Sequence, residues 1–416
     1  MDSIQQQLIN AKLAKRDMLA LSISDRDSIL LNISESILNN IPIILEENKK
    51  DLSLMDPQDP KYDRLLLTKQ RLVNLAASVL DVQSLEDPTD KIISSNTLAN
   101  GLHVEKRTVA LGVVGMIYEA RPNVTIDVAA LCIKSGNVSL LRGGSDAHHT
   151  NSCLVAIMHE VLRSMQINVH IIQLLPSGRE FVEQLLNARG FVDVIIPRGS
   201  QGLIDYVRTH ASVPVIETGA GVCHTYVDDT ADIEMAVSIV VNAKTSRPSV
   251  CNSLDTILIH QSLAEPFVKS LALAMSTHNV EIFASNELYN FFNQAKYPCL
   301  SRASEEDFGR EFLSLKCSIK SVSSLQQALD HIEQYSSKHS ECIVSKNENN
   351  INHFLNHVDA AAVYANASTR FTDGAEFGLG AEIGISTQKL HARGPFALEK
   401  LTTEKWYIRG QGQIRN

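Results

Sequence analysis

A cysteine, Cys251, stands in the segment Thr245-Ser-Arg-Pro-Ser-Val-Cys-Asn252, between a helical pattern and a strand pattern. Pro248 disfavours helical conformation at Arg247, so we expect this cysteine to lie on a loop. The cations Lys244 and Arg247 stand close by in the sequence, and nearby cations lower the pKa of a thiol. Cys251 is therefore either a nucleophile or, like most cysteines, a small buried apolar side chain.

Other segments place polar groups where a backbone can approach a ligand. Glu217 follows the apolar run 213–216 and precedes two glycines, so it is either a functional acid or a strand-end carboxylate that binds loop amides. Gly199 and Ser200 precede a helical pattern, and the free amides of a helix N-terminus can bind phosphate. Arg142 ends a strand pattern, where it can meet a ribose or its phosphate, or be a surface cation.

Two groupings, a Cys–His pair and an acidic cluster that suggests a metal, favour simpler interpretations. Cys223 and His224 are adjacent, and adjacent side chains of a strand point to opposite faces. Asp228, Asp229 and Asp232 precede a helical pattern, where acids complement the helix dipole. Because the chain also has no Cys-x-x-Cys pair, we predict no metal site.

The composition is that of an ordinary globular protein with two or three domains. The 416 residues are 44% hydrophobic and 20% charged. The formal net charge of −9 disfavours nucleic acid as a partner. No apolar run reaches the roughly 18 residues that a membrane span needs, and the N-terminal segment contains no apolar signal core. The seven cysteines are irregularly spaced, so we expect reduced thiols and a cytoplasmic protein.

The apolar patterns predict a helical layer followed by two α/β domains. Residues 1 to about 90 are expected to be helical, and residues 97–104 to form a hairpin on Asn100-Gly101. Alternating strand and helix patterns then favour parallel sheets covered by helices. The terminal residues 405–409 are expected to form a strand that pairs with the hairpin or with another subunit. Predicted strands are 110–117, 138–141, 169–174, 192–196, 213–216, 254–259 and 342–344, and predicted helices are 127–134, 151–163, 203–208, 232–244, 263–275 and 324–334.

Five segments together resemble the aldehyde dehydrogenase superfamily, and more narrowly its branch that reduces γ-glutamyl phosphate. The resemblance implies an α/β, aldehyde dehydrogenase-like fold. Residues 1–94 and 111–226 would form a Rossmann-type cofactor-binding domain, 227–390 an α/β catalytic domain, and 95–110 with 401–416 a small β oligomerisation flap. The matching segments are EARPNVTIDVAALCIKSGN (119–137), VPVIETGAGVCHTYVD (213–228), NAKTSRPSVCNSLDT (242–256), ALDHIEQYSSKHSECI (328–343) and FGLGAEIGISTQKLHARGPFALEKLTTEKW (377–406).

The resemblance also implies a reaction, the second step of proline biosynthesis from glutamate. L-glutamate 5-phosphate (γ-glutamyl phosphate) would be reduced with NADPH to L-glutamate 5-semialdehyde plus phosphate, with the acyl group carried by Cys251 as a thioester. Asn123 matches the asparagine of the superfamily's oxyanion hole, although an ungapped alignment places Arg121 there. Glu217 matches the general base, but the Leu-Gly-Gly-Lys run that follows this acid in the superfamily is replaced here by 218–221. That departure favours a role for Glu217 in orienting the cofactor or amides.

For the cofactor, the resemblance implies four binding residues. Arg142 falls where the superfamily has a lysine near the adenosine ribose, and an arginine suits the 2′-phosphate of NADPH. Gly199 and Ser200 fall on the pyrophosphate turn, and Glu311 falls on the acid that holds the nicotinamide ribose.

For the substrate, Arg247 and Arg121 suit the acyl phosphate. The resemblance places two loops, 366–372 and 377–386, the second of which begins at Phe377, to hold the other end. The resemblance also implies a homo-oligomer, a dimer or a tetramer, with glutamate 5-kinase as a candidate partner.

Two rival interpretations of the function stay open. An ordinary aldehyde dehydrogenase would oxidise an aldehyde with NAD and needs Glu217 as base, whereas a scaffold protein on the same fold would have lost the thiol or the cofactor turn.

Overall fold

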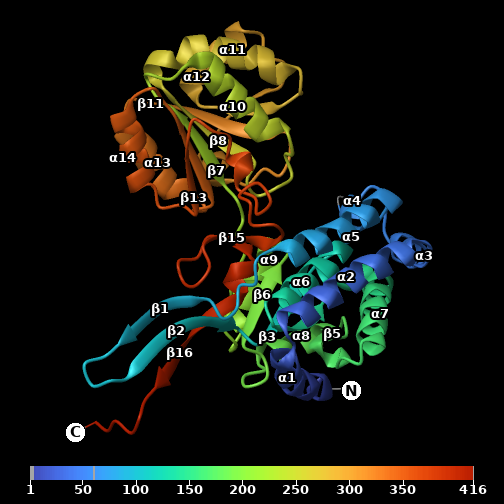
Figure 1. Cartoon of the computed structure of the whole chain (residues 1–416). Coiled ribbons are helices and arrows are strands. Elements are labelled where there is room, and N and C mark those ends of the chain that lie inside the picture. The colour runs from blue at the N-terminus through green and yellow to red at the C-terminus, as the bar shows by residue number, and fades with distance from the viewer. Residues whose placement is uncertain (1–3, 60, 416) are drawn as a thin grey trace. The chain divides into compact units, whose positions relative to one another are not determined.

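The computed structural model describes residues 4–59 and 61–415 (Figure 1). The chain divides into two compact units. Unit 1 comprises Met1–Thr218, Gly378–Gly384 and Pro395–Asn416, and unit 2 comprises Gly219–Phe377 and Ile385–Gly394. Each unit contains its own parallel sheet with helices packed on it, as the alternating patterns predict.

A four-stranded parallel sheet forms the centre of unit 1, in the order β5-β4-β3-β6. Its chain starts in the middle strand, adds two strands on one side and then crosses to the other side, as in the first half of a Rossmann fold. The carboxyl ends of β3 and β6 therefore meet at the topological switch point, where such sheets bind ligands. The strands are β3 (Val113–Tyr118), β4 (Val138–Arg142), β5 (Ile172–Leu174) and β6 (Val194–Arg198).

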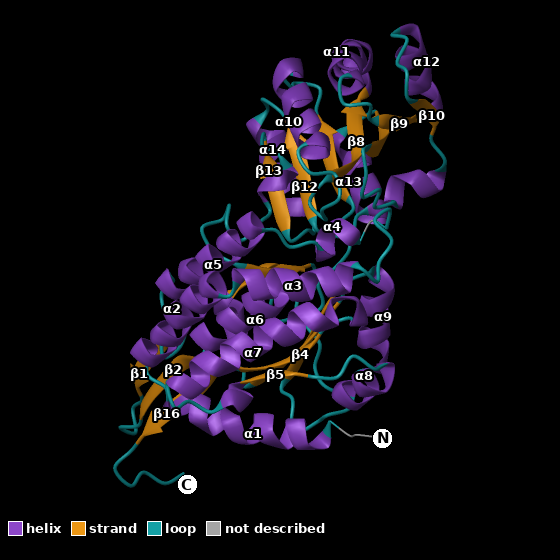
Figure 2. Ribbon diagram, turned by 90° about the vertical axis from the view of Figure 1, so that its right-hand side faces the viewer, coloured by secondary structure: helices purple, strands orange, loops and turns teal. Residues whose placement is uncertain are grey.

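Nine helices are described in unit 1. Helices α2, α6 and α7 pack together as a layer over the sheet (Figure 2). Ser22 and Asp25 form a capping box that fixes the start of α2. The helices are α1 (Gln5–Ala20), α2 (Ile23–Asn39), α3 (Ile41–Leu52), α4 (Tyr62–Leu65), α5 (Lys69–Ser84), α6 (Pro122–Lys134), α7 (His148–Ser164), α8 (Arg179–Leu186) and α9 (Gln201–His210).

In the described part of the chain, no single helix is long and apolar enough to cross a membrane. The pair α2 and α3 meets the length and composition criteria only when joined, and the two helices are bent by 71° at their junction.

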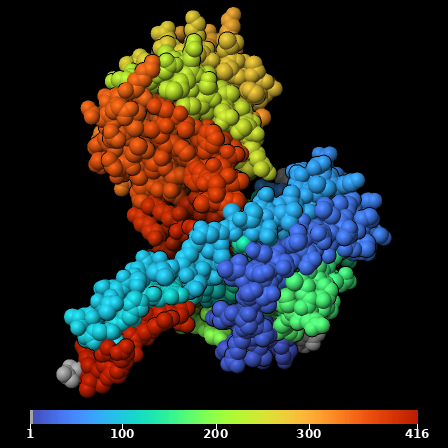
Figure 3. All heavy atoms as spheres, in the orientation of Figure 1, coloured from blue at the N-terminus to red at the C-terminus, as the bar shows by residue number. Residues whose placement is uncertain are grey.

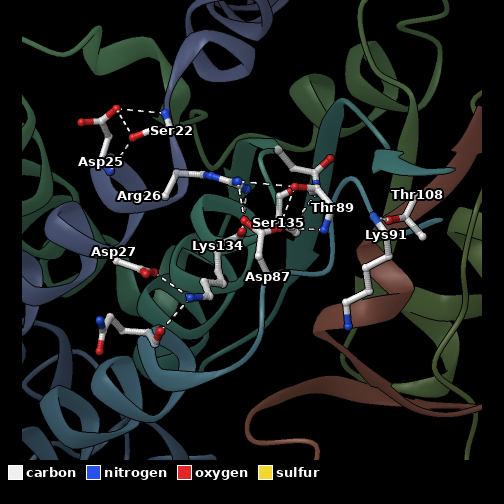
Figure 4. A network of polar contacts seen from close by, with 12 residues as sticks. Ser22, Asp25, Arg26, Asp27, Asp87, Thr89, Lys91, Thr108, Lys134 and Ser135 are labelled. Carbon is white, nitrogen blue, oxygen red and sulfur yellow. Dashed lines mark hydrogen bonds and ion pairs between the residues drawn. The ribbon is translucent and has the colours of Figure 1, made fainter. Parts of the chain in front are cut away.

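A buried polar network attaches the N-terminal helices to α6 (Figure 4). The Arg26 guanidinium donates to the Asp87 carboxylate at 2.5 Å and to the Lys134 carbonyl at 2.8 Å. The Lys134 ammonium in turn donates to Asp27 at 2.6 Å and to the Gln83 carbonyl at 2.7 Å. Both cations are buried, so each needs these partners to offset the loss of water. The network fixes the C-terminal end of α6, whose first turn carries Asn123.

A three-stranded antiparallel sheet extends as an arm beyond the helices of unit 1 (Figures 1 and 3). Strands β1 (Ile92–Thr97) and β2 (His103–Ala110) form the predicted hairpin, and Gly101 takes the positive φ of 86° that the Asn-Gly turn requires. The predicted terminal strand is β16 (Thr402–Arg409), which pairs with β2 of the same chain. The Trp406 side chain is 57% exposed on this sheet.

Unit 2 is built on a seven-stranded parallel sheet, in the order β10-β9-β11-β8-β7-β12-β13. Asp232 caps the predicted helix α10 by accepting from the Met235 amide. The strands are β7 (Cys223–Val227), β8 (Leu254–His260), β9 (Glu281–Ala284), β10 (Leu300–Arg302), β11 (Lys316–Val322), β12 (Ser340–Val344) and β13 (Ala362–Ala365), and the helices are α10 (Ile233–Thr245), α11 (Ala264–Ser276), α12 (Asn286–Gln294), α13 (Leu325–Tyr335) and α14 (Glu348–His357). Two further strands, β14 (Glu382–Ser386) and β15 (Gly394–Ala397), pair with each other.

Several predicted strands differ from those observed. The predicted strand 213–216 is wrong, because Pro214 has no N–H for a ladder and the segment makes only an isolated bridge between Val215 and Ile195. The predicted strand 110–117 is two strands in different sheets, since Gly112 turns the chain at a φ of 128°. The segment 169–174 begins as a 3₁₀ turn, and β6 starts two residues later than the predicted 192.

Candidate active site

Cys251 lies on the loop between α10 and β8, as the sequence predicts. Its side chain is half-buried, whereas Asn252 and Ser253 after it are buried. The loop turns back on itself through a hydrogen bond from the Ser253 amide to the Val250 carbonyl, 3.0 Å long. The thiol therefore lies at the amino edge of the unit 2 sheet, beside Cys223 at the start of β7.

Side chains from distant segments fix the backbone on both sides of the thiol. The Asn252 amide group donates to the Thr372 carbonyl at 2.9 Å, and the Asn252 carbonyl accepts from the Thr369 hydroxyl at 2.8 Å. On the other side, the Cys223 thiol donates to the Cys251 carbonyl at 3.3 Å. Because these groups are held before any substrate arrives, the loop presents Cys251 in a preorganised position.

Gly221 lies against the backbone of Cys251 so closely that only glycine fits. A Cβ on Gly221 would lie 1.6 Å from the Cys251 carbonyl oxygen. The Gly221 amide donates to the Glu311 carboxylate at 2.9 Å. The structure thus brings Glu311, which the resemblance assigned to the cofactor, next to the segment that packs on the thiol's loop.

Lys244 does not serve the thiol as the sequence suggests. Its side chain is fully buried, donates to the Lys316 carbonyl at 2.9 Å and lies 3.5 Å from the Asp255 carboxylate. Burial raises the pKa of Asp255 to about 6, against the opposing effect of Lys244. Asp255 also accepts from the Phe312 amide at 3.0 Å, so this buried pair holds the segment that carries Glu311. The expectation that Lys244 activates Cys251 is wrong, because its charge is directed into the core.

In unit 1, the predicted phosphate turn lies at the switch point between β3 and β6. Ser200 is the N-cap of α9, and the free amides at that end can bind an anion. The anion present is the carboxylate of Glu119, which follows β3 and accepts from the Ser200 amide at 2.8 Å and from its hydroxyl at 3.2 Å. A Cβ on Gly199 would lie 2.6 Å from the same carboxylate, so a larger residue would have to displace the Glu119 side chain.

Arg142 lies at the carboxyl end of β4, as predicted. One terminal nitrogen of its guanidinium donates to the Ser177 carbonyl at 2.5 Å. Burial lowers the pKa of Arg142, and the neighbouring cation Arg179 lowers it further. Two arginines that repel one another at the edge of the sheet favour an anionic ligand there.

The remaining predicted site residues have the following positions. Asn123 is exposed in the first turn of α6, where its amide donates to Asp127 at 3.0 Å. Arg121 precedes α6 and is half-buried. Glu217 of unit 1 lies 3.6 Å from the Arg208 guanidinium. Phe377 is 44% exposed. The roles assigned to these four residues stay predictions.

Sequence reasoning did not single out three residues that the geometry brings to these places, although one of them, Arg370, lies in the 366–372 loop that the resemblance assigns to the substrate. Glu119 and Arg179 each follow a strand at the binding edge of the unit 1 sheet. Their positions after strand patterns could have marked them as candidate binding residues in the sequence. Arg370 contacts residues on both sides of the Cys251 segment, although it lies more than a hundred positions later in the chain. Within residues 4–59 and 61–415, no three His, Cys, Asp or Glu side chains gather as a metal site.

The fold and the thiol loop define a class of protein. Residues 2–286 match the aldehyde dehydrogenase family, and the chain belongs to this family. Gamma-glutamyl phosphate reductase of Chlorobium phaeobacteroides (strain BS1) is 53% identical over 416 residues, 100% of this chain and 99% of that protein. The protein of the same name from Legionella pneumophila (strain Paris) is 51% identical over 415 residues, 99% of each chain.

A solved structure agrees with these relatives. The crystal structure of gamma-glutamyl phosphate reductase from Thermotoga maritima has a TM-score of 0.95 and 36% identity, with 100% of both chains covered. The predicted family and the predicted aldehyde dehydrogenase-like fold are therefore confirmed.

Proposed function

We propose that this chain reduces γ-glutamyl phosphate to glutamate 5-semialdehyde and phosphate, with NADPH as the reductant and Cys251 as the nucleophile. The single observation that carries the proposal is the half-buried thiol on a loop whose neighbouring carbonyls are both held by distant side chains. The name shared by the relatives that span nearly the whole chain supports the choice of substrate.

The reaction needs few acid–base groups. The Cys251 thiolate attacks the acyl carbon, the bond to the phosphate oxygen breaks, and phosphate departs with the electron pair. When bound, NADPH supplies the hydride that reduces the resulting thioester. Collapse of the thiohemiacetal then expels the Cys251 thiolate and forms the aldehyde. Preorganised donors stabilise the oxyanion of each tetrahedral state, and the side-chain amide of Asn123 stays the predicted donor for this role.

Glu217 is proposed not to activate water. In the forward reaction, water would hydrolyse the thioester and waste the intermediate. In the reverse reaction, phosphate and not water accepts the acyl group, so neither direction needs an activated water. The run after Glu217 supports this, because Gly221 packs on the Cys251 backbone and leaves no room for a larger side chain. The carboxylate lies near Arg208, and we assign it to orienting the cofactor.

The aldehyde dehydrogenase family uses nicotinamide cofactors, and residues of unit 1 fit one. The Ser200 amide at the start of α9 already holds a carboxylate, so it can hold a pyrophosphate oxygen. Arg142 and Arg179 lie near one another at the carboxyl edge of the unit 1 sheet, and their two charges support their assignment to the 2′-phosphate of NADPH. Glu311 is assigned to the nicotinamide ribose.

Arg142→Leu is expected to weaken binding of NADPH by about 10- to 100-fold, the worth of a charge-assisted hydrogen bond, and to change NADH binding by less than about threefold. Fluorescence titration of both nucleotides measures the two dissociation constants. The matched control is Arg163→Leu, an exposed arginine on α7. An equal loss for NADPH and NADH would contradict the assignment of Arg142 to the 2′-phosphate.

Glu119→Gln is expected to tighten NADPH binding by about three- to tenfold. The Glu119 carboxylate occupies the helix N-terminus that the pyrophosphate needs, and the amide keeps the shape but removes the competing negative charge. The same titration measures the effect, with Glu160→Gln on α7 as a control for net charge. Unchanged or weaker binding would place the pyrophosphate away from Ser200.

Phosphate dependence tests the proposed function against its rival. Oxidation of glutamate semialdehyde with NADP⁺ should require inorganic phosphate, because phosphate releases the acyl group from Cys251. Production of glutamate at the same rate without phosphate would indicate an ordinary aldehyde dehydrogenase.

We also propose that the β1-β2-β16 sheet, with its exposed Trp406, mediates a homo-oligomer. Glutamate 5-kinase stays a candidate partner.

A further inference from the structure

A pair of arginines lies beside Cys251 within unit 2. The Arg370 guanidinium donates through Nε to the Ser246 hydroxyl at 3.1 Å and through Nη1 to the Asn252 side-chain oxygen. These two partners stand on either side of the segment that carries Arg247 and Cys251. Arg370 therefore spans the thiol's loop and lies next to Arg247.

The two guanidinium groups are close enough to affect one another. Burial lowers the pKa of Arg370, and the charge of Arg247 lowers it next, with smaller opposing effects from Asp373, Cys251 and Glu376. Among the described residues, neither arginine forms an ion pair with a carboxylate within 4.0 Å. Two adjacent cations without such a partner repel one another, and a bound anion removes that cost.

We infer that Arg370 and Arg247 together form the binding site for the phosphoryl group of the substrate, and for the phosphate that leaves or attacks in the reaction. This inference rests on the proposed function and adds Arg370 to it, although the resemblance assigns the 366–372 loop that carries Arg370 to the other end of the substrate. The planar guanidinium binds phosphate oxygens in pairs, so two arginines can hold a dianion with defined orientation.

The position of Arg370 selects the phosphoryl group over the amino-acid end of the substrate. Both hydrogen-bonded partners of its guanidinium flank Cys251 in the same short segment, so the cation lies beside the thiol that would attack the acyl carbon. The phosphoryl oxygen is bonded to that carbon, whereas the α-carboxylate is four carbons further along the glutamyl chain. Arg370 thus acts where negative charge accumulates as phosphate leaves.

Alkylation of Cys251 tests this arginine pair without requiring catalysis. The full-length protein is treated with iodoacetate, an anion, or with iodoacetamide, which is neutral, and the Cys251 peptide is quantified by mass spectrometry. We expect inorganic phosphate to slow the reaction with iodoacetate at least about fivefold and to affect iodoacetamide much less. The ratio of the iodoacetate rate to the iodoacetamide rate should fall about tenfold in Arg370→Gln.

Variants separate anion binding from loop structure. Arg247→Gln removes a charge without removing either Arg370 hydrogen bond, and it should also lower the rate ratio and the protection by phosphate. Arg370→Lys should keep most of the ratio, which a purely structural role for the guanidinium would not predict. Lys269→Gln, an exposed cation on α11, controls for net charge and should behave as the wild type.

The outcomes distinguish this inference from the proposed function. If the inference holds, Arg370→Gln should raise the KM for phosphate in semialdehyde oxidation at least about tenfold and leave the KM for the aldehyde within about threefold. Protection of Cys251 by glutamate but not by phosphate would overturn the inference and assign the pair to the carboxylate. Protection by phosphate in a protein without reductase activity would retain the anion site and refute the function.

Discussion

Replacing Cys251 with alanine is expected to lower the rate of γ-glutamyl phosphate reduction by more than about 10⁴-fold while NADPH still binds. The covalent route disappears with the sulfur, and removal of a nucleophile commonly costs several orders of magnitude. The neighbouring Cys223 cannot replace it, because that thiol is buried and burial raises its pKa well above its ordinary value. Turnover is followed by NADPH absorbance, and nucleotide binding by fluorescence.

The control for this substitution is Cys299→Ala, which removes a half-buried cysteine elsewhere in unit 2. This variant should keep its activity within about threefold, as expected for a substitution away from the reacting groups. Appreciable reduction by Cys251→Ala, with NADPH bound normally, would exclude the thioester route.

Gly221→Ala should lower kcat/KM by at least about a hundredfold without unfolding the protein. The new Cβ would lie 1.6 Å from the Cys251 carbonyl oxygen, so the backbone that presents the thiol has to move. A displacement of about 1 Å at a reacting group can cost about a hundredfold in rate. The same shift would disturb the Gly221 amide that donates to Glu311, so the KM for NADPH should rise as well.

A matched control lies in the same run of residues. A Cβ on Gly219 would meet the side chain of Thr387, whose hydroxyl at 2.9 Å is the one atom closer than 3.0 Å, and that side chain can rotate. Gly219→Ala should therefore lose much less activity than Gly221→Ala. Equal activities for the two variants, with equal melting temperatures, would contradict the role of the Gly221 contact.

The local features of the fold could be predicted because their causes are local. Pro248 ends the helical region before Cys251, Asn100-Gly101 forms a turn, and Asp232 caps α10. The strand predicted at 213–216 failed for a reason that was visible in the sequence, since Pro214 cannot extend a ladder. Short strands such as β9 and β10 carry too few residues for a reliable period-two pattern.

The contacts that make the candidate site could not be predicted in the same way, because they join residues that are far apart in the chain. Gly221 meets Cys251, Glu119 meets Ser200, and Arg370 meets Asn252 only after the sheets have formed. For Lys244, proximity in the sequence suggested an interaction with Cys251 that the fold does not favour. It lies near Cys251 in sequence, but its side chain points into the core and pairs with Asp255. Proximity in sequence did not determine the direction of the side chain.

The most direct test of the account is to detect the acyl group on Cys251. The protein is mixed with glutamate semialdehyde and NADP⁺ in phosphate-free buffer, quenched in acid, and its peptides are examined by mass spectrometry. A glutamyl adduct should accumulate on the peptide that contains Cys251 and disappear when inorganic phosphate is added before the quench. Formation of NADPH with glutamate released, no adduct on Cys251, and no response to phosphate would contradict the proposed mechanism.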